Sequence, residues 1–182
     1  FHRPHSIALD GRGGLYVADI GNHRIRRIDL ETGTVETIAG NGKRQLPRDG
    51  QVAREAPVVG PRALFIDQTT MWVALREGHS VWTLDLTNGK WHHVAGTGEK
   101  GFSGDGAPAK AATFNGPKGI AVGPSGHVYV VDTENQAIRK IDTTTGLIST
   151  VAGAGDGGPA TQAQLDRPHG ICVAPNGTIY IG

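Results

Sequence analysis

The sequence has a single cysteine, few aromatic residues, almost no net charge and no long hydrophobic run. Cys172 alone excludes an internal disulfide framework and a cysteine-based zinc cluster. The 18 basic and 17 acidic residues give a net charge of +1, so overall charge favours neither nucleic acid nor an anionic membrane as a partner. Because no run of about 18 apolar residues occurs, no membrane-spanning helix is expected.

Glycine and proline are plentiful, with 28 and 10 copies, which is typical of an all-β chain with short strands and tight turns. The stretch at residues 129–153, YVVDTENQAIRKIDTTTGLISTVAG, returns at residues 16–40 and in weaker form at residues 72–96. A unit of this size is too small to bury a hydrophobic face alone, so the sequence predicts a repeat architecture.

A proline opens each unit, at Pro4, Pro61, Pro117 and Pro168, with spacings of 57, 56 and 51 residues. Each proline is followed by an apolar run, a turn and a second run that begins with an aromatic residue, which predicts a hairpin. A third strand is expected at residues 25–28 and 138–141. Its apolar residues lie three apart, so we expect a bulge. A fourth strand, at residues 35–38, 91–94 and 148–151, ends in Ala-Gly.

Four antiparallel strands per repeated unit predict the blades of a β-propeller. The predicted units are residues 1–60, 61–116 and 117–167, each a blade with its interblade loop, and residues 168–182 are the first two strands of a fourth. Since a closed ring needs at least about four blades, we expect an incomplete arc. Such an arc exposes blade edges, through which copies of the chain could associate.

The loop between units has a constant register. An aspartate (Asp49, Asp105, Asp156) is followed by glycine, by alanines four and seven residues later, by an apolar residue at the ninth position and by the next proline at the twelfth. This pattern predicts one helical turn capped by the aspartate, with its alanines packed on the neighbouring blade.

Several motifs resemble the NHL-repeat family of β-propellers: Pro-x-x-Ile-Ala, the Tyr-Val-x-Asp strand, NHRIRRID at residues 22–29, the Val-Ala-Gly ending and GDGGPA at residues 155–160. The similarity covers essentially the whole chain. The resemblance implies a ring of about six blades, of which this chain would supply an arc. It also implies either a binding module or, as in a few family members, an enzyme.

Strand alternation places the interblade loops, the starts of the first strands and the turns between second and third strands on one face of the disc, which we call the top face. Loops on a rigid scaffold carry function, so site residues are sought there. Asp19, Asn22, Asp132 and Asn135 occupy equivalent turns on this face. They are candidate ligand contacts; alternatively they hydrogen-bond the backbone of their own turns.

The units differ at the residue after each opening proline, which is His5, Arg62, Lys118 or His169. If these prolines open the innermost strands, the four side chains surround the mouth of the central channel and are candidate ligand contacts. Two cations there favour an anionic ligand or a peptide carboxylate. In an NHL-related lyase that completes peptide C-terminal amidation, histidines in similar Pro-His-Ser and Pro-His-Gly contexts bind a metal, and His5 and His169 resemble that pattern. Zinc catalysis needs about three protein ligands.

The basic groups at residues 24–27 and 43–44 lack interleaved stacking aromatics, so no nucleic-acid partner is expected. The sequence therefore favours a non-catalytic binding module with no cofactor, whose top face recognises a protein, peptide or glycan. The alternative is a metal-assisted lyase or hydrolase that uses a divalent metal at the channel mouth. Cysteine usage does not fix the compartment, and an extracellular or periplasmic location is favoured over a cytoplasmic one.

Overall fold

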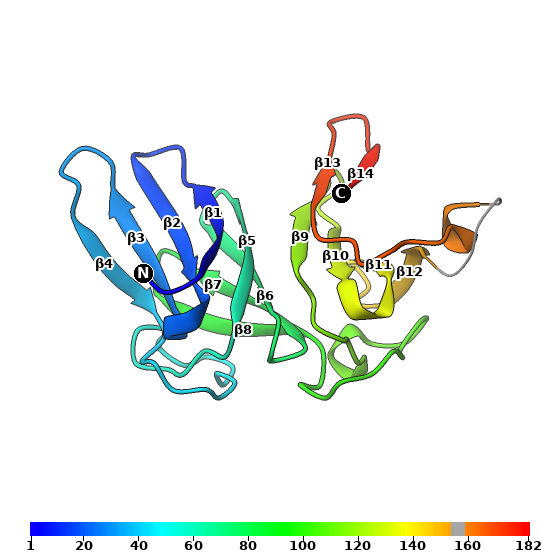
Figure 1. Ribbon diagram of the computed structural model, residues 1–182, viewed down its shortest axis with the longest axis horizontal. Coiled ribbons are helices and arrows are strands. Elements are labelled where there is room, and N and C mark those ends of the chain that lie inside the picture. Colours follow the sequence, from blue (N-terminus) through cyan, green and yellow to red (C-terminus); the bar gives the residue numbers. More distant parts are fainter. Residues whose placement is uncertain (154–158) are drawn as a thin grey trace.

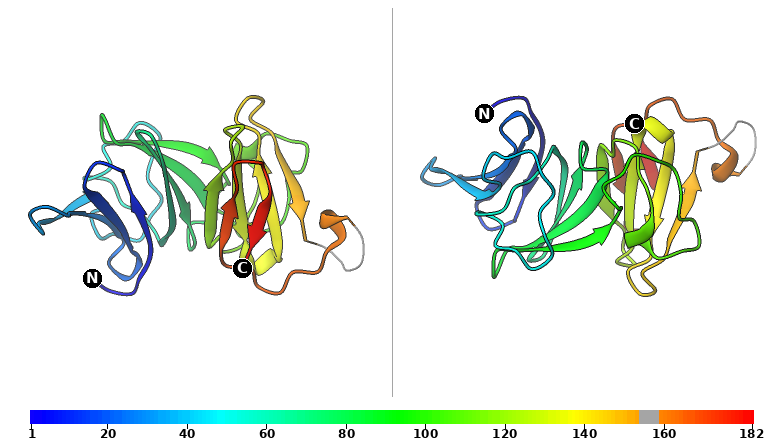
Figure 2. Two further views of the ribbon diagram at one scale, coloured as in Figure 1. Left: turned by 90° about the horizontal axis from the view of Figure 1, so that it is seen from above. Right: turned by 90° about the horizontal axis from the view of Figure 1, so that it is seen from below.

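A computed structural model describes residues 1–153 and 159–182 of the chain. Its strands form three four-stranded antiparallel sheets and one two-stranded sheet, each built from consecutive strands. Figures 1 and 2 show the sheets following one another along a curved row whose first and last members do not meet. The predicted all-β fold, a partial propeller of four-stranded blades, is confirmed.

Each blade takes its strands in chain order. Blade 1 contains β1 (Pro4–Leu9), β2 (Gly14–Asp19), β3 (Arg24–Asp29) and β4 (Val35–Ala39). Blade 2 contains β5 (Pro61–Asp67), β6 (Thr70–Leu75), β7 (Ser80–Asp85) and β8 (Lys90–Ala95). Blade 3 contains β9 (Gly119–Val122), β10 (Val128–Asp132), β11 (Ala137–Ile141) and β12 (Ile148–Ala152), and β13 (Ile171–Val173) pairs with β14 (Ile179–Ile181).

The first strand of each blade is the innermost one. β1 contacts β5, β5 contacts β9, and β9 contacts β13. The hydrophobic core consists of layers between blades. One cluster joins blades 1 and 2 around Trp91 and Met71, a second joins blades 2 and 3 around Phe114 and Ile141, and a third contains Ile138 and Val131. Because adjacent blades bury their facing surfaces against each other, the innermost strand ends are held in fixed register.

Each blade has a bulge between its third and fourth strands, but the extra residue (Ile38, Val94 or Val151) lies in the fourth strand, so the prediction of a bulge in the third strand is wrong. The pairing of β3 with β4, β7 with β8 and β11 with β12 shifts register after Ile25, Val81 and Ile138, respectively. Ile138 and Ile141 of the third strand lie in different core clusters, because residues three apart on a regular strand point to opposite faces of the blade and both faces are buried.

The predicted Asp-capped helical turn is wrong in its cap. The 3₁₀ helix η2 (Ala109–Ala111) follows Pro108 and has no side-chain cap. Asp105 instead accepts a hydrogen bond from the backbone N–H of Thr150, and Asp49 accepts one from His93, both on the outermost strand of the next blade. These carboxylates hydrogen-bond the outer strand of the next blade and not the N–H groups of the turn. The equivalent Asp156 lies outside the described residues.

Ala53, Ala56, Ala109 and Ala112 are buried in the core clusters between blades, as predicted, whereas Ala160 in the third loop is exposed. One face of β1, by contrast, is exposed to solvent. Ile7 is 66% exposed, whereas Leu64 and Ile120, at the same register in the next two blades, are 6% and 5% exposed. A neighbouring blade covers the latter two. No helix in the described part of the chain is long and apolar enough to cross a membrane.

Candidate binding site at the channel mouth

The structure brings the four residues that follow the opening prolines around one cavity. His5, Arg62, Lys118 and His169 all line a space of about 380 Å³ at the ends of the innermost strands. The pairing of β1 with β2 and of β5 with β6 shifts register directly after the proline, so the next residue leaves the regular ladder. This irregularity turns the side chain toward the channel mouth.

One side of the mouth is neutralised by a carboxylate. The Lys118 ammonium donates a hydrogen bond to Glu134 over 2.9 Å and lies 3.2 Å from Nε2 of His169. Arg167 contacts the same oxygen of Glu134 at 3.2 Å. The hydrogen bond from Lys118 is the main cause that lowers the pKa of Glu134. Burial lowers the pKa of His169, and the charge of Lys118 lowers it further.

The other side of the mouth has no such carboxylate. Arg62 is half-buried and makes no hydrogen bond or ion pair with any residue in the described part of the chain. Burial lowers the pKa of the Arg62 guanidinium, and the positive charge of Arg76 adds to this effect. The pKa of His5 is also lowered, first by burial and then by the charges of Arg62 and Arg76. Glu77 opposes these charges only in part, so this side is a region of net positive potential.

The mouth does not assemble a set of metal ligands. Within residues 1–153 and 159–182, no group of three or more His, Cys, Asp or Glu side chains is placed to hold a metal ion. Nε2 of His169 faces the ammonium of Lys118, so the lone pair that a metal would need is occupied by a hydrogen-bond donor.

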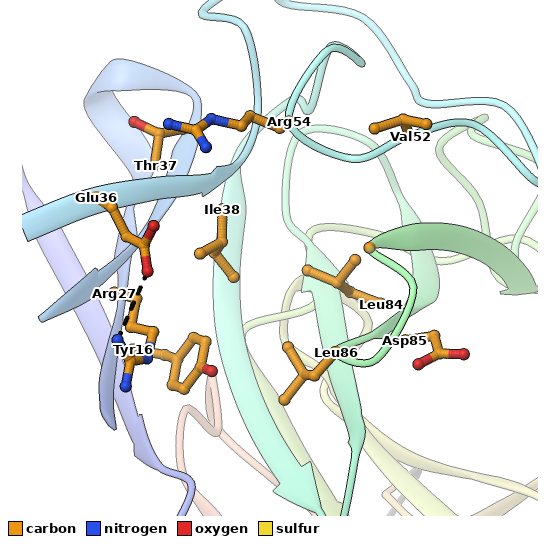
Figure 3. A pocket seen from close by; sticks show the side chains of 11 residues that line it. Tyr16, Arg27, Glu36, Thr37, Ile38, Val52, Arg54, Leu84, Asp85 and Leu86 are labelled. Atoms are coloured by element: carbon orange, nitrogen blue, oxygen red, sulfur yellow. Dashed lines mark ion pairs between the residues drawn. The ribbon is translucent and has the colours of Figure 1, made fainter. Parts of the chain in front are cut away.

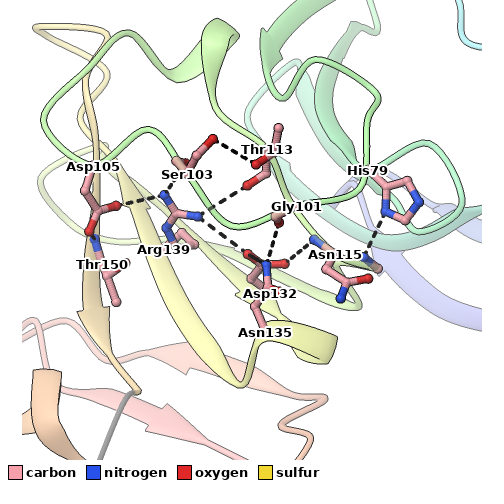
Figure 4. Close-up of polar contacts among 11 residues, drawn as sticks. His79, Gly101, Ser103, Asp105, Thr113, Asn115, Asp132, Asn135, Arg139 and Thr150 are labelled. Carbon is pink, nitrogen blue, oxygen red and sulfur yellow. Dashed lines mark hydrogen bonds and ion pairs between the residues drawn. The ribbon is translucent and has the colours of Figure 1, made fainter.

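The turn candidates on the top face form two equivalent hydrogen-bonded pairs. Asn22 donates to Asp19 over 2.8 Å, and Asn135 donates to Asp132 over 2.8 Å. The second oxygen of Asp19 accepts the N–H of His2, and that of Asp132 accepts the N–H of Asn115 (Figure 4). These carboxylates therefore bind the segment that enters the first strand, rather than the backbone of their own turns. Both are almost fully buried.

Sequence reasoning missed Arg139, which lies at the centre of this network (Figure 4). Its guanidinium contacts Asp105 at 2.8 Å and Asp132 at 3.5 Å, donates to the carbonyl of Ser103, and lies 4.9 Å from the ring centre of Phe102. Burial raises the pKa of Asp132, which hydrogen bonds and Arg139 oppose. The cluster fastens the interblade loop to blade 3, and the aligned position holds Arg26 in blade 1 but Trp82 in blade 2.

Two further cavities open on the top face between blades. The first interblade cavity, about 230 Å³, is lined by His2, Arg3, His5, Ile20, Gly21, His23, Arg44, Arg76 and Glu77. The second interblade cavity, about 720 Å³, is lined by Arg76, Glu77, His79, Lys100, Asn115, Gly116 and Glu134. Comparing the repeats could have predicted one cation in each interblade cavity, because Arg44 and Lys100 both stand five residues before the loop aspartate.

A cavity of about 400 Å³ also lies on the outer flank between blades 1 and 2 (Figure 3). Tyr16 and Ile38 of blade 1 face Leu84 and Leu86 of blade 2 across it, and Arg27 pairs with Glu36 at its edge. Burial raises the pKa of the Tyr16 phenol. This space lies away from the four mouth residues and does not contain any of them.

Comparison with known families accounts for the repeated motifs. The sequence model of the teneurin NHL domain matches residues 62–154, more than half of the chain, and the model of the NHL repeat matches residues 1–28. The chain belongs to the NHL-repeat family. The resemblance seen in the motifs is thereby confirmed.

This NHL propeller is similar to parts of much longer proteins. It is 28% identical over 199 residues to Protein SUPPRESSOR OF QUENCHING 1, chloroplastic, of Arabidopsis thaliana, with 100% of this chain and 19% of that protein covered. It is 27% identical over 205 residues to NHL repeat-containing protein 2 of Homo sapiens, with 94% and 28% covered. The chain thus spans less than a third of the length of either relative.

Solved structures show the same fold at low identity. A protein of unknown function from Bacteroides thetaiotaomicron matches with a TM-score of 0.76 and 23% identity, over 99% of this chain and 44% of that one. A chain of a nidogen/laminin complex matches with a TM-score of 0.64 and 15% identity, over 94% and 52%. A catalytically inactive virginiamycin B lyase from Staphylococcus aureus matches with a TM-score of 0.60 and 16% identity, over 98% and 48%.

Proposed function

We propose that this NHL propeller is a binding module whose top face recognises a protein, peptide or glycan through the channel mouth. The observation that carries the proposal is the convergence of His5, Arg62, Lys118 and His169 on one cavity. Features repeated in every blade serve blade packing, whereas these four equivalent positions hold three different residue types and line a cavity. A ligand site must break the repeat symmetry in this way.

The comparisons support a binding role without naming a ligand. One structural neighbour is a chain of a protein–protein complex, and another is a lyase, so the fold alone does not separate binding from catalysis. The lyase alternative gains no support from the mouth, where Nε2 of His169 faces Lys118 and, among the described residues that line it, no nucleophile is hydrogen-bonded to a paired base.

The test is to probe peptide and glycan arrays with the purified protein and then with two variants. The first carries His5→Ala, Arg62→Ala and Lys118→Ala on the top face. The control carries Glu31→Ala and Lys90→Ala at exposed positions of the opposite face. We expect the bound ligands to be lost with the first variant and kept with the control. Equal binding by both variants would refute a top-face site.

A further inference from the structure

Two cavities of the top face share one residue. His5 lines both the channel mouth and the first interblade cavity, so the two spaces meet at its side chain. A ligand that lies in the mouth beside Arg62 can therefore continue over His5 toward Arg44 and Arg76.

Positive charge along this path is only partly neutralised. Arg3, Arg44 and Arg62 make no hydrogen bond or ion pair through their side chains with residues 1–153 or 159–182. Arg76 pairs with Glu77 at 2.9 Å, and Glu77 is the one carboxylate among the described residues that line the first interblade cavity. By contrast, the second interblade cavity has two cations, Arg76 and Lys100, and two carboxylates. Unpaired guanidinium groups around a cavity favour carboxylate ligands, which they bind in bidentate geometry.

We propose that the channel mouth and the first interblade cavity together bind an acidic peptide segment with two carboxylates, one beside Arg62 and the other between Arg44 and Arg76. This inference rests on the proposed function and specifies the ligand of the same site.

The observations favour an acidic peptide over a nucleic acid or an acidic polysaccharide. The residues that line the first interblade cavity include no Trp, Tyr or Phe on which bases could stack. A polyanion that spread over the top face would also meet Glu77 and Glu134, which flank Arg76 in the second interblade cavity. A peptide can instead place isolated carboxylates only where the cations stand.

The surroundings of His5 agree with this placement. Its pKa is lowered by burial, then by Arg62 and Arg76, while Glu77 opposes them and Arg3 adds a smaller effect. The histidine at the junction of the two cavities thus lies in positive potential on both sides.

The probe is a series of fluorescently labelled, C-terminally amidated peptides in which two glutamates are separated by an increasing number of glycine or serine residues. Anisotropy at low ionic strength gives the affinity of the purified protein for each peptide. The glutamine counterpart of each peptide is the neutral control. We expect one spacing to bind best, and each Glu→Gln change in that peptide to weaken binding about tenfold.

Matched variants locate the site. Arg44→Gln is exposed and without side-chain contacts, so it should fold normally and weaken binding about tenfold. Lys100→Gln, at the same register in the next loop, should leave the affinity unchanged within about twofold. Arg62→Gln should act like Arg44→Gln, and an unaltered unfolding midpoint shows that its loss is not a folding defect.

Three results would overturn the inference: equal affinity for the glutamate and glutamine peptides, equal loss with Arg44→Gln and Lys100→Gln, or tighter binding of a single-stranded RNA or an oligouronate of matched charge. None of these three results contradicts the proposed function, provided that the top-face variant still loses its ligands on the arrays. If that variant keeps them, the proposed function itself fails.

Discussion

Nδ1 of His79 accepts a hydrogen bond from the backbone N–H of Gly116 over 3.0 Å, so a side chain of blade 2 holds the entrance to blade 3. His23 makes the same contact with Gly60 at 3.3 Å, between blades 1 and 2. Both histidines adopt left-handed backbone conformations, with φ of 44° and 51°. These contacts fix the residues before Pro61 and Pro117, and hence Arg62 and Lys118 at the channel mouth.

This contact predicts a pH dependence of stability. Burial lowers the pKa of His79, and the charge of Lys100 lowers it further. The folded state therefore binds fewer protons than the unfolded state, and the stabilisation is fully present above about pH 6.5 and lost as the pH falls below that value. The free energy of unfolding, measured with urea from about pH 7.5 to about pH 5, should fall more steeply in the wild type than in His79→Gln.

Glutamine is a suitable replacement because Gln136 occupies the same position and left-handed conformation in blade 3. The control is Gln45→Asn, an exposed substitution that removes no titratable group and should keep the wild-type slope. If His79→Gln and the wild type lose stability in parallel as the pH falls, the imidazole of His79 does not hold Gly116 in its neutral form.

The buried Arg139 predicts a large loss of stability on truncation. Arg139→Met leaves the carboxylate of Asp132 buried with one charged partner fewer, which should cost about 3–5 kcal/mol in the free energy of unfolding. Asp105→Asn should cost less than about 1 kcal/mol, because the Asp105 side chain is 52% exposed and its ion pair is screened. Urea unfolding at neutral pH measures both.

The same variant has a pH signature. Burial already raises the pKa of Asp132, and loss of Arg139 should raise it further. A folded-state pKa above the unfolded value means that protonation favours folding, so the deficit of Arg139→Met relative to the wild type should shrink as the pH falls. A deficit that stays constant with pH would mean that lost packing on Phe102 and Phe114, rather than the charge of Asp132, causes the destabilisation.

Sequence comparison was sufficient for the blades because their repeated features are local. Turn glycines, strand pairs and the Ala-Gly ending of the fourth strand all recur at fixed spacing. The contacts of Asp105 and Asp132 could not be read in this way, because their partners Thr150 and Asn115 are 45 and 17 residues away. Both aspartates looked like local caps or turn residues.

The four side chains were predicted to surround the channel mouth. In the structure a carboxylate pairs with Lys118 on one side of the mouth, whereas the Arg62 side remains positive. The sequence shows one residue after each proline, and it gives no sign that Glu134 reaches Lys118 while no carboxylate pairs with Arg62. That difference arises in the turn between second and third strands, where blade 2 has Arg76 followed by Glu77 and blade 3 has Thr133 followed by Glu134. Only the fold brings these turns beside the opening prolines.

The repeated Ala-Gly ending predicts a strict requirement for glycine. At Gly96, φ is +88° and an added Cβ would overlap the carbonyl oxygen of His79. At Gly40 and Gly153 the added Cβ would overlap the equivalent carbonyl oxygens, those of His23 and Gln136. Gly96→Ala should therefore lower the free energy of unfolding by at least about 2 kcal/mol. Gly89, in an open turn with φ of +67° and no atom near the added Cβ, is the control. Gly89→Ala should cost only about 1 kcal/mol.

The ion pair at the mouth predicts how His169 titrates. Lys118→Met removes the positive charge 3.2 Å from Nε2, so the pKa of His169 should rise toward its ordinary value. NMR titration of the His169 ring protons measures this change, and Lys100→Met, an exposed cation outside the mouth, should leave the curve unshifted. Glu134 should lose its main stabilising hydrogen bond in the same variant, so its pKa should rise as well, although Arg167 still opposes the rise. An unchanged His169 curve would show that the Lys118 ammonium does not lie beside Nε2 of His169 in solution.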